Sequence, residues 1–219
     1  MHTAYSTIAA RVAPLCLIRH GLTDLNRREL ACGRGTNCPL SEGGVAQIEA
    51  LGERLARQQF VARLIVHSPM LRAKQSAQIL ADSLGAELQQ DDDLAEQDLG
   101  SWEGLPWPDV FARLQANRQP PGGESRDSFT QRVWLAFARL VLEDGSAVRP
   151  IVVAHGGTFF ALGWPWRRVS HAIPNGVPFM LNYLGDPTSP WGSRRLQFDG
   201  AWVHHDLYAH CEGASHAVP

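Results

Sequence analysis

Cysteine is scarce in this sequence, and the cysteines present are not spaced as in common metal-binding motifs. There are four, and no two of them show the CxxC spacing: Cys16, Cys32, Cys38 and Cys211. Cys16 falls inside an apolar run that we interpret as a core strand. A disulfide framework or a zinc knuckle is therefore disfavoured, and we expect reduced thiols.

The sequence also lacks any block of consecutive lysines and arginines. Its formal net charge is −2 and its pI is about 6.5. Proteins that neutralise a row of nucleic-acid phosphates need a basic face, so we expect no nucleic-acid partner. A small anion, in contrast, needs only a local group of cationic side chains.

No hydrophobic run at the start of the chain is long enough to span a bilayer. The apolar patch there is interrupted by Arg11 and Pro14, and it lacks a charged start followed by a small-residue cleavage site. We therefore expect a cytoplasmic protein with no membrane partner.

Histidines near the C-terminus raise the question of a metal site. The candidate ligands lie in a stretch rich in Gly, Ala and Ser: His204, His205, His210, Cys211 and His216. This composition is more typical of a polar tail or an edge segment than of a metal site. We predict no metal and no cofactor.

A chain of 219 residues, 44% of them hydrophobic, is long enough to bury one sizeable core. We find no internal repeat, and we predict a single domain over residues 1–219. Its core covers about 13–205, with a short cap insertion over about 102–123 and a C-terminal tail over about 206–219. Trp102 and Trp107 in the cap fit either a pocket wall or ordinary packing.

Short apolar runs alternate with helical patterns along the chain. Runs at 15–18, 64–66 and 151–154 are typical of strands covered on both faces. Further strands are expected at 179–184 and 196–203, at an antiparallel edge. The alternation predicts an α/β fold, a three-layer α/β/α sandwich with a mostly parallel central sheet.

Three helices are predicted between the strands. Ser41 is the expected N-cap of a helix through Gln58. Pro69 fits the first turn of a second helix, which carries Leu71, Ile79 and Leu84 and ends near Gly85. A third helix begins near Ser125 or Ser128, ends at a turn over 144–145, and carries Phe129, Val133, Phe137, Leu140 and Val141.

Unusual residues follow three of the predicted strands. They are Arg19-His20-Gly21, then His67-Ser68 with Arg72 in the next helix, and His155-Gly156-Gly157. In an open α/β sheet, ligands bind beyond the carboxyl ends of the strands. Arginines, glycine turns and helix N-termini at such an edge favour a dianion. Taken alone, each residue has an ordinary structural interpretation, and Arg72 is typical of an exposed helix surface.

These residues belong to motifs that together resemble the histidine phosphatase superfamily, also called the phosphoglycerate mutase-like family. The motifs occur in the family's order: RHG at 19–21 with Thr23 and Asn26, PLSEGG at 39–44, SPMLRAKQSA at 68–77, LAEQDLGSWEG at 94–104 and VVAHGG at 152–157. The chain departs from the family pattern at Leu22, where many members have Glu, and at Asn37, where Asp is frequent.

The resemblance implies a role for each matching residue. His20 would be the nucleophile that forms a phosphohistidine, and Glu96 would donate a proton to the leaving oxygen. The remaining implied phosphate ligands are Arg19, Arg72 and His155, with Gly21, Thr23, Asn26 and Gly156 adding contacts. Glu103 is the competing carboxylate, for which we favour a structural role.

The implied chemistry places a requirement on the His20 imidazole. Its reacting nitrogen must be unprotonated, so the other nitrogen should donate to a fixed acceptor, such as the backbone carbonyl of Gly21 or of a neighbouring residue. Arginines in place of a metal would stabilise the charge on the transferred phosphoryl group. A cover containing Trp102 would raise the pKa of Glu96 by excluding water.

The expected activity is metal-independent hydrolysis of a small phosphorylated metabolite, with release of inorganic phosphate. The short segment at 105–123 favours a phosphatase over a mutase, and GGES followed by FTQRV is similar to broad-specificity and α-ribazole phosphatases. Trp102, Trp107 and Phe111 suit an apolar leaving group. Alternatives are a phosphoglycerate mutase, a non-catalytic phosphate-recognition domain and a metal-dependent hydrolase, and a homodimer is allowed for.

Overall fold

A single β-sheet organises the part of the chain that the structure describes. The computed structural model describes residues 15–143, 150–162, 173–183, 191–195 and 203–205. Within these residues the sheet order is β3-β2-β4-β1-β5-β6-β7. The strand bounds are β1 Leu15–Arg19, β2 Leu64–His67, β3 Glu87–Gln90, β4 Ile151–Ala154, β5 Pro178–Tyr183, β6 Trp191–Arg195 and β7 Val203–His205.

The sheet has a parallel half and an antiparallel half. Strands β3, β2, β4 and β1 pair in parallel, whereas β5, β6 and β7 continue the sheet from β1 in antiparallel register. The predicted strands at 15–18, 64–66, 151–154 and 179–184 are confirmed up to Tyr183. The antiparallel edge is confirmed as well.

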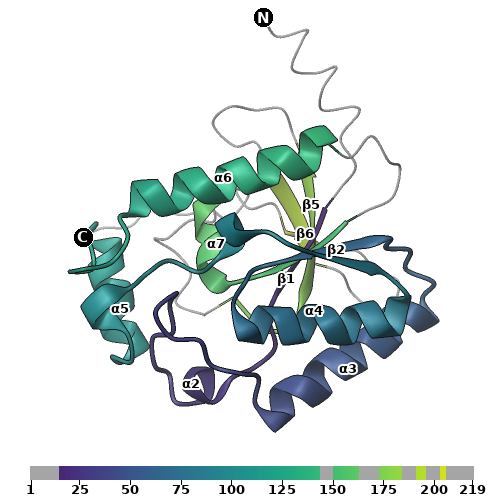
Figure 1. Cartoon of the computed structure of the whole chain (residues 1–219), viewed down its shortest axis with the longest axis horizontal. Helices are drawn as coiled ribbons and strands as arrows, with labels where there is room; N and C mark the ends of the chain where they lie inside the picture. The colour runs from purple at the N-terminus through teal and green to yellow at the C-terminus, as the bar shows by residue number, and fades with distance from the viewer. Residues whose placement is uncertain (1–14, 144–149, 163–172, 184–190, 196–202, 206–219) are drawn as a thin grey trace, which may run out of the picture.

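Helices cover both faces of the sheet, which confirms the three-layer sandwich (Figure 1). Helices α3 (Glu42–Arg57) and α4 (Leu71–Leu84) lie on one face, and α6 (Arg126–Glu143) and α7 (Gly156–Ala161) lie on the other. Strand β1 shows why both faces need to be covered by helices. Its side chains alternate between the two layers, with Leu17 in the α6 and α7 cluster and Ile18 in the α3 and α4 cluster.

Side-chain caps determine where two of these helices begin. The hydroxyl of Ser41 accepts from the Gly44 amide at 3.1 Å, and that of Ser125 accepts from the Ser128 amide at 3.1 Å. The predicted start at Ser41 is confirmed, as is Ser125 among the two starts offered for the third helix. The turn predicted at 144–145 lies outside the described residues.

Helix α4 differs from its prediction in two respects. It begins at Leu71 after Met70, so Pro69 lies before the first turn, and Asn37 caps it by accepting from the Leu71 amide at 2.7 Å. The apolar residues that we expected it to carry also do not form its buried side, because Leu71, Ile79 and Leu84 are only half-buried. The buried residues are small, apart from one leucine and one arginine: Arg72, Ala73, Ser76, Ala77, Leu80 and Ala81.

Small residues on α4 allow its backbone to pack closely against its neighbours. A Cβ on Gly52 of α3 would lie 2.4 Å from the hydroxyl oxygen of Ser83, so the two helices are in close contact there. Arg72 has no exposed surface. The interpretation of Arg72 as a surface arginine is therefore wrong.

The predicted cap insertion contains helix α5 (Trp107–Gln115), and a 3₁₀ turn (Gly100–Trp102) leads into it. Two other short elements are helix α2 (Asp24–Arg27) and a 3₁₀ turn (Asp92–Leu94). Trp102 is buried with Ala31, Leu99, Val110 and Leu114 in a small separate cluster. Trp102 therefore attaches α5 to the loop after α2.

Edge strands were the hardest elements to predict. Strand β3 is largely polar, and β6 lies in a Trp/Gly/Ser/Arg stretch, so neither has an apolar run. Of the predicted strand at 196–203, only Val203 is described, and it begins β7 with His204 and His205 at the sheet edge. His210, Cys211 and His216 lie outside the described residues. No helix in the described part of the chain is long and apolar enough to cross a bilayer.

Candidate active site

The carboxyl ends of β1, β4 and β2 lie side by side, so the residues after them meet. Arg19 is in register with Ala154, and His67 is in register with Val153. The rings of His20 and His155 are consequently 5.3 Å apart between centroids. The strand-end pattern in the sequence therefore predicted a real convergence.

Two hydrogen bonds hold the His20 ring. Its Nδ1 lies 2.7 Å from the carbonyl oxygen of Gly21, and its Nε2 lies 3.2 Å from Nε of Arg72. A carbonyl can only accept and a guanidinium can only donate, so Nδ1 carries the proton and Nε2 has the free electron pair. The expected tautomer and the expected partner Gly21 are both present.

Burial keeps His20 uncharged. Loss of hydration, followed by the nearby charges of Arg72 and Arg19, lowers the pKa of His20 well below its usual value. The same causes, with burial again the largest, lower the pKa of His155. Both imidazoles are therefore neutral at neutral pH. The Gly21 amide donates to the hydroxyl of Ser76 at 3.0 Å, so it is not available to a ligand. Gly21 contributes to the site through its carbonyl, which accepts from His20.

Arg72 connects His20 to the loop over residues 31–40. Its guanidinium donates to the carbonyl oxygens of Thr36 at 3.0 Å and of Cys32 and Gly33 at 3.2 Å. A buried cation needs several acceptors to offset its lost hydration, and this loop supplies them. Arg72 is thus a fully buried charge adjacent to Nε2 of His20.

Two further polar atoms at the site have no partner among the described residues. They are Nε of Arg19 and Nδ1 of His155, both buried. The hydroxyl of Ser68 accepts from the Met70 amide and lies 2.7 Å from Nε2 of His155, so it can donate there and leave the proton of His155 on Nδ1. Unpaired buried polar atoms are rare, and two of them beside His20 indicate a site for a ligand such as an anion.

Glu96 lies on the other side of the cavity, between the 3₁₀ turn at 92–94 and α7. Its Oε1 accepts from the Gln97 amide at 2.9 Å and its Oε2 from the Gly157 amide at 3.2 Å. Burial raises the pKa of Glu96, although these amides and the two arginines oppose the rise. Trp102, which we expected to cover Glu96, does not line the cavity and packs with Ala31 and Leu99.

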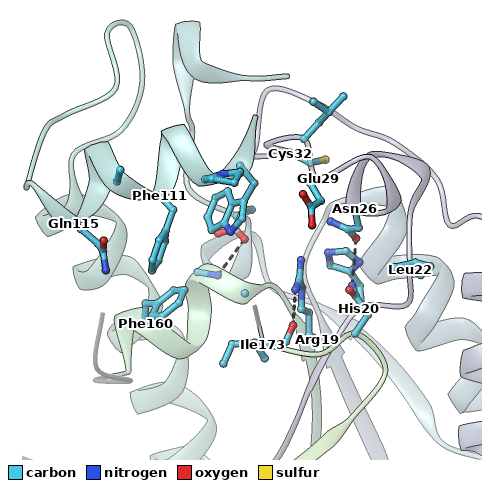
Figure 2. A pocket seen from close by; sticks show the side chains of 18 residues that line it. Arg19, His20, Leu22, Asn26, Glu29, Cys32, Phe111, Gln115, Phe160 and Ile173 are labelled. Atoms are coloured by element: carbon cyan, nitrogen blue, oxygen red, sulfur yellow. Dashed lines mark hydrogen bonds between the residues drawn. The ribbon is translucent and has the colours of Figure 1, made fainter. Parts of the chain in front are cut away.

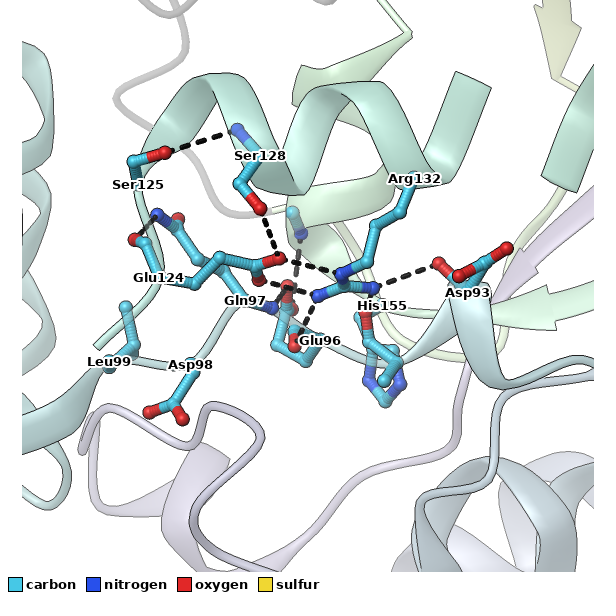
Figure 3. A network of polar contacts seen from close by, with 12 residues as sticks. Asp93, Glu96, Gln97, Asp98, Leu99, Glu124, Ser125, Ser128, Arg132 and His155 are labelled. Carbon is cyan, nitrogen blue, oxygen red and sulfur yellow. Dashed lines mark hydrogen bonds and ion pairs between the residues drawn. The ribbon is translucent and has the colours of Figure 1, made fainter. Parts of the chain in front are cut away.

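Arg132 of α6 holds the backbone that carries Glu96 (Figure 3). It donates to the carbonyl oxygens of Asp93 at 2.8 Å, Ala95 at 2.6 Å and Glu96 at 2.9 Å. Its remaining donors form a two-point ion pair with Glu124, at 2.8 and 2.7 Å. Neither Arg132 nor Glu124 was assigned a role from the sequence, although both lie in the GGES and FTQRV stretches.

Glu103 has the structural role that we favoured for it. Its carboxylate accepts from the amides of Gly33 and Gly35 at 2.9 and 3.0 Å and from the hydroxyl of Thr36 at 2.9 Å. These are residues of the same loop that binds Arg72. Glu103 therefore holds the loop from one side and Arg72 holds it from the other.

Thr23 and Asn26 form a reciprocal cap at the start of α2. The Thr23 hydroxyl accepts from the Asn26 amide at 3.2 Å, and Asn26 Oδ1 accepts from the Thr23 amide at 3.3 Å. Asn26 lines the cavity, but Thr23 is fully buried outside it. Asn175, which the sequence did not single out, also lines the cavity and donates to the His20 carbonyl at 2.8 Å.

The cavity has a volume of about 430 Å³, within the range of small-molecule sites. Figure 2 shows Arg19, His20 and Asn26 on one side and Phe111, Phe160 and Gln115 on the other. The Phe111 ring lies 5.7 Å from the Trp107 ring and 6.1 Å from the Phe160 ring, between centroids. Gly156 lines the charged side. Arg72 and His155 do not line the cavity themselves, but they contact His20 from behind its wall. His67, whose Nδ1 is 2.8 Å from the Ser68 carbonyl oxygen, does not line the cavity either.

Comparison with known proteins is decisive for the family. A model of the histidine phosphatase superfamily (branch 1) matches residues 15–175. The chain belongs to the histidine phosphatase superfamily. The matched range includes every residue of the site described above.

The relatives of this chain include proteins named as phosphatases. A bifunctional protein of Mycobacterium tuberculosis is 38% identical over 151 residues, which are 64% of this chain and 40% of that protein. The chain thus matches less than half of the length of that relative. A protein named uncharacterized phosphatase PhoE from Bacillus subtilis is 33% identical over 148 residues, covering 68% of this chain and 74% of that one.

The solved structure of a mycobacterial phosphatase is similar to most of this chain. The mycobacterial glucosyl-3-phosphoglycerate phosphatase in complex with VO3 is 29% identical, with a TM-score of 0.68, and the match covers 84% of this chain and 97% of that one. The similarity therefore extends through the central sheet and the surrounding helices.

The Arg132 network yields a prediction about stability. In Arg132→Met, three backbone carbonyls lose their hydrogen-bond donor and the partly buried Glu124 loses its ion-pair partner. We therefore expect the free energy of unfolding to fall by about 2–4 kcal/mol. Arg139→Met on the same helix is the matched control, because Arg139 pairs with Asp91 and Asp93 and its side chain is 42% exposed. We expect less than about 1 kcal/mol there. Equal losses in urea unfolding would contradict this assignment.

Proposed function

We propose that this protein is a metal-independent phosphomonoesterase that acts through a phosphohistidine at His20. The observation that carries the proposal is the unprotonated Nε2 of His20 beside Arg72, with the unpartnered Nε of Arg19 and Nδ1 of His155. These groups suit a phosphate dianion, whose negative oxygens would pair with the two guanidinium groups.

In the first step, Nε2 of His20 attacks phosphorus and the bond from phosphorus to the ester oxygen breaks. The proton of Glu96 passes to the leaving alkoxide, giving a neutral alcohol. Arg19, Arg72 and Nδ1 of His155 stabilise the charge spread over the other phosphoryl oxygens. The raised pKa of Glu96 supports this role, because it favours the protonated form before the reaction.

In the second step, the ionised Glu96 takes a proton from water. The water oxygen bonds to phosphorus while the bond between phosphorus and Nε2 breaks. Inorganic phosphate leaves, His20 regains its electron pair, and Glu96 is protonated again. Arg132 contributes by holding the chain on which this carboxylate is mounted.

The cavity supports a substrate with an apolar part next to its phosphate. Trp107, Phe111 and Phe160 form a wall at the end away from His20. A small phosphorylated metabolite would place its alcohol portion against this wall. The short cap and the phosphatase relatives favour water over a second sugar-acid acceptor in the last step.

The nucleophile is tested by trapping the intermediate. His20→Ala should lower turnover of 4-nitrophenyl phosphate by roughly 10⁴-fold or more and abolish acid-labile phosphate bound to the protein, measured after rapid quenching with labelled substrate. His67→Gln is the matched control, since His67 is another buried strand-end histidine outside the cavity. Protein-bound label that survives in His20→Ala would exclude this nucleophile.

Three further arms of the same experiment separate the rival activities. Transfer of the label to a phosphoglycerate instead of to water would indicate a mutase. Loss of turnover with a chelator would indicate a metal-dependent hydrolase. Phosphate binding without turnover would indicate a recognition domain.

The proton donor is tested by varying the leaving group. Glu96→Gln should lower kcat/KM for an alkyl phosphate by about 10²- to 10⁴-fold, and for 4-nitrophenyl phosphate by less than about 10-fold. The nitrophenolate leaves without a proton, and kcat/KM reports only the first irreversible step. Glu103→Gln is the control, because it acts through the loop and should affect both esters alike.

The pH dependence follows from the same assignment. Because the pKa of Glu96 is raised and the protonated form is needed, kcat/KM for the alkyl ester should fall as pH rises through that pKa. This limb should vanish in Glu96→Gln. His20 adds no acid limb near neutrality, because its pKa is lowered. A limb unchanged by the substitution would point to another acid.

Gly157 provides a steric test of Glu96 placement. A Cβ at Gly157 would lie 2.2 Å from Oε1 of Glu96 and 3.0 Å from Cζ of Phe129. Gly157→Ala should therefore displace the carboxylate and lower kcat/KM for the alkyl ester by about 10- to 100-fold. Gly43→Ala, where a Cβ meets nothing within 4 Å, should leave kcat/KM unchanged. Equal values for both variants would contradict the proposed geometry.

A further inference from the structure

Cys32 and Cys38 bring two thiols together beside the proposed phosphate site. Their Sγ atoms are 3.2 Å apart, and both residues are partly exposed. Cys32 also lines the cavity, as Figure 2 shows. Neither side chain has a part in the chemistry proposed above, so their contact needs a separate explanation.

The two cysteines are held together by a loop that is fixed at several points. Glu103 accepts from Gly33, Gly35 and Thr36, and Asn37 accepts from the first amide of α4. Arg72 donates to the carbonyls of Cys32, Gly33 and Thr36. Closing a short, already ordered loop has a small entropic cost, so the thiols are well prepared for bonding.

The two thiols also differ in acidity. A hydrogen bond from Cys32, and then the charge of Arg72 and a hydrogen bond from Thr23, lower the pKa of the Cys38 thiol despite its burial. The hydrogen bond with Cys38, together with burial, raises the pKa of the Cys32 thiol. One thiolate next to one thiol is the arrangement from which disulfides form.

We propose that Cys32 and Cys38 form a reversible disulfide on oxidation by a hydroperoxide, and that this bond weakens phosphate binding by shifting the Arg72 loop. The disulfide and its effect on phosphate binding go beyond the proposed function. Only the turnover arm of the experiment below rests on that function.

The chemistry consists of two balanced steps. The Cys38 thiolate attacks one oxygen of hydrogen peroxide, which forms a sulfenic acid and releases hydroxide. The sulfur of Cys32 then attacks the sulfur of the sulfenic acid, which forms the disulfide and releases water with the Cys32 proton. The two thiols lose two electrons in total, which reduce the peroxide. A dithiol reductant reverses the change.

The effect on the site follows from the length of the new bond. A disulfide requires its sulfurs to approach to about 2.05 Å, so the two sulfur atoms must move together by roughly 1 Å from their present contact, and we expect the loop that carries them to shift with them. The carbonyls of Cys32, Gly33 and Thr36, which orient Arg72, all lie between the two bonded positions or at one of them. A displacement of that size at a phosphate ligand is expected to weaken binding by about 10- to 100-fold.

The test uses the full-length, fully reduced protein treated with hydrogen peroxide. Peptide mass spectrometry should find the peptides of Cys32 and Cys38 joined, with the loss of two hydrogen atoms. Calorimetry should give a Kd for inorganic phosphate about 10- to 100-fold higher, with a similar rise in KM for 4-nitrophenyl phosphate. A dithiol should restore all three properties.

Two variants serve as controls, each compared with its own reduced form. Cys38→Ser should lose the response to peroxide, whereas Cys211→Ser should retain it. No joined peptide, or Cys38 joined to Cys211, would overturn the proposal, as would a disulfide that leaves phosphate binding unchanged. An inactive protein that still forms the bond and loses phosphate affinity would refute the proposed function but support this inference.

Discussion

Arg72 is a cation with no exposed surface, and its guanidinium contacts both His20 and the loop over residues 31–40. A charge buried in this way is tolerated only when acceptors surround it. The loop turns three carbonyls toward it for that reason, and Glu103 supports the loop from behind. The small residues of α4 allow Arg72 to reach this position beneath the strand ends. Removing any of these partners would leave either a charge or a carbonyl unsatisfied.

The proposed nucleophile and the proposed acid are positioned by different parts of the fold. His20 follows β1 and is oriented by Arg72 of α4, on one face of the sheet. Glu96 is held by the Gly157 amide of α7 and by the Arg132 network of α6, on the other face. The cavity therefore lies where the two layers meet at the carboxyl edge of the sheet. The distance between His20 and Glu96 therefore depends on how both helix layers pack against the sheet. For this reason many of the hydrogen bonds that position these two residues lie outside the cavity.

Sequence reasoning found the strand ends, the order of motifs and the cap at Ser41, because each is a local pattern with a local cause. It missed features that depend on contacts between distant segments. Arg132 is one residue in an amphipathic helix until the chain at 93–96 folds against it, and Asn175 has no distinguishing neighbours in sequence. The contact between Cys32 and Cys38 depends on a loop whose shape Arg72 and Glu103 determine. For Trp102 the sequence allowed either a pocket wall or ordinary packing, and its contacts with α5 and Ala31 show that it packs.

The hydrogen bond from Arg72 to Nε2 of His20 has a consequence for selectivity. The electron pair needed for attack is engaged by the same guanidinium that would grip a phosphoryl oxygen. A reagent that brings negative oxygens competes for Arg72 and thereby uncovers the imidazole. A neutral electrophile, such as a carboxylic ester or an alkylating agent, offers Arg72 no comparable partner and meets a masked base. The enzyme would thus be protected against acylation and alkylation by the arginine that assists its chemistry.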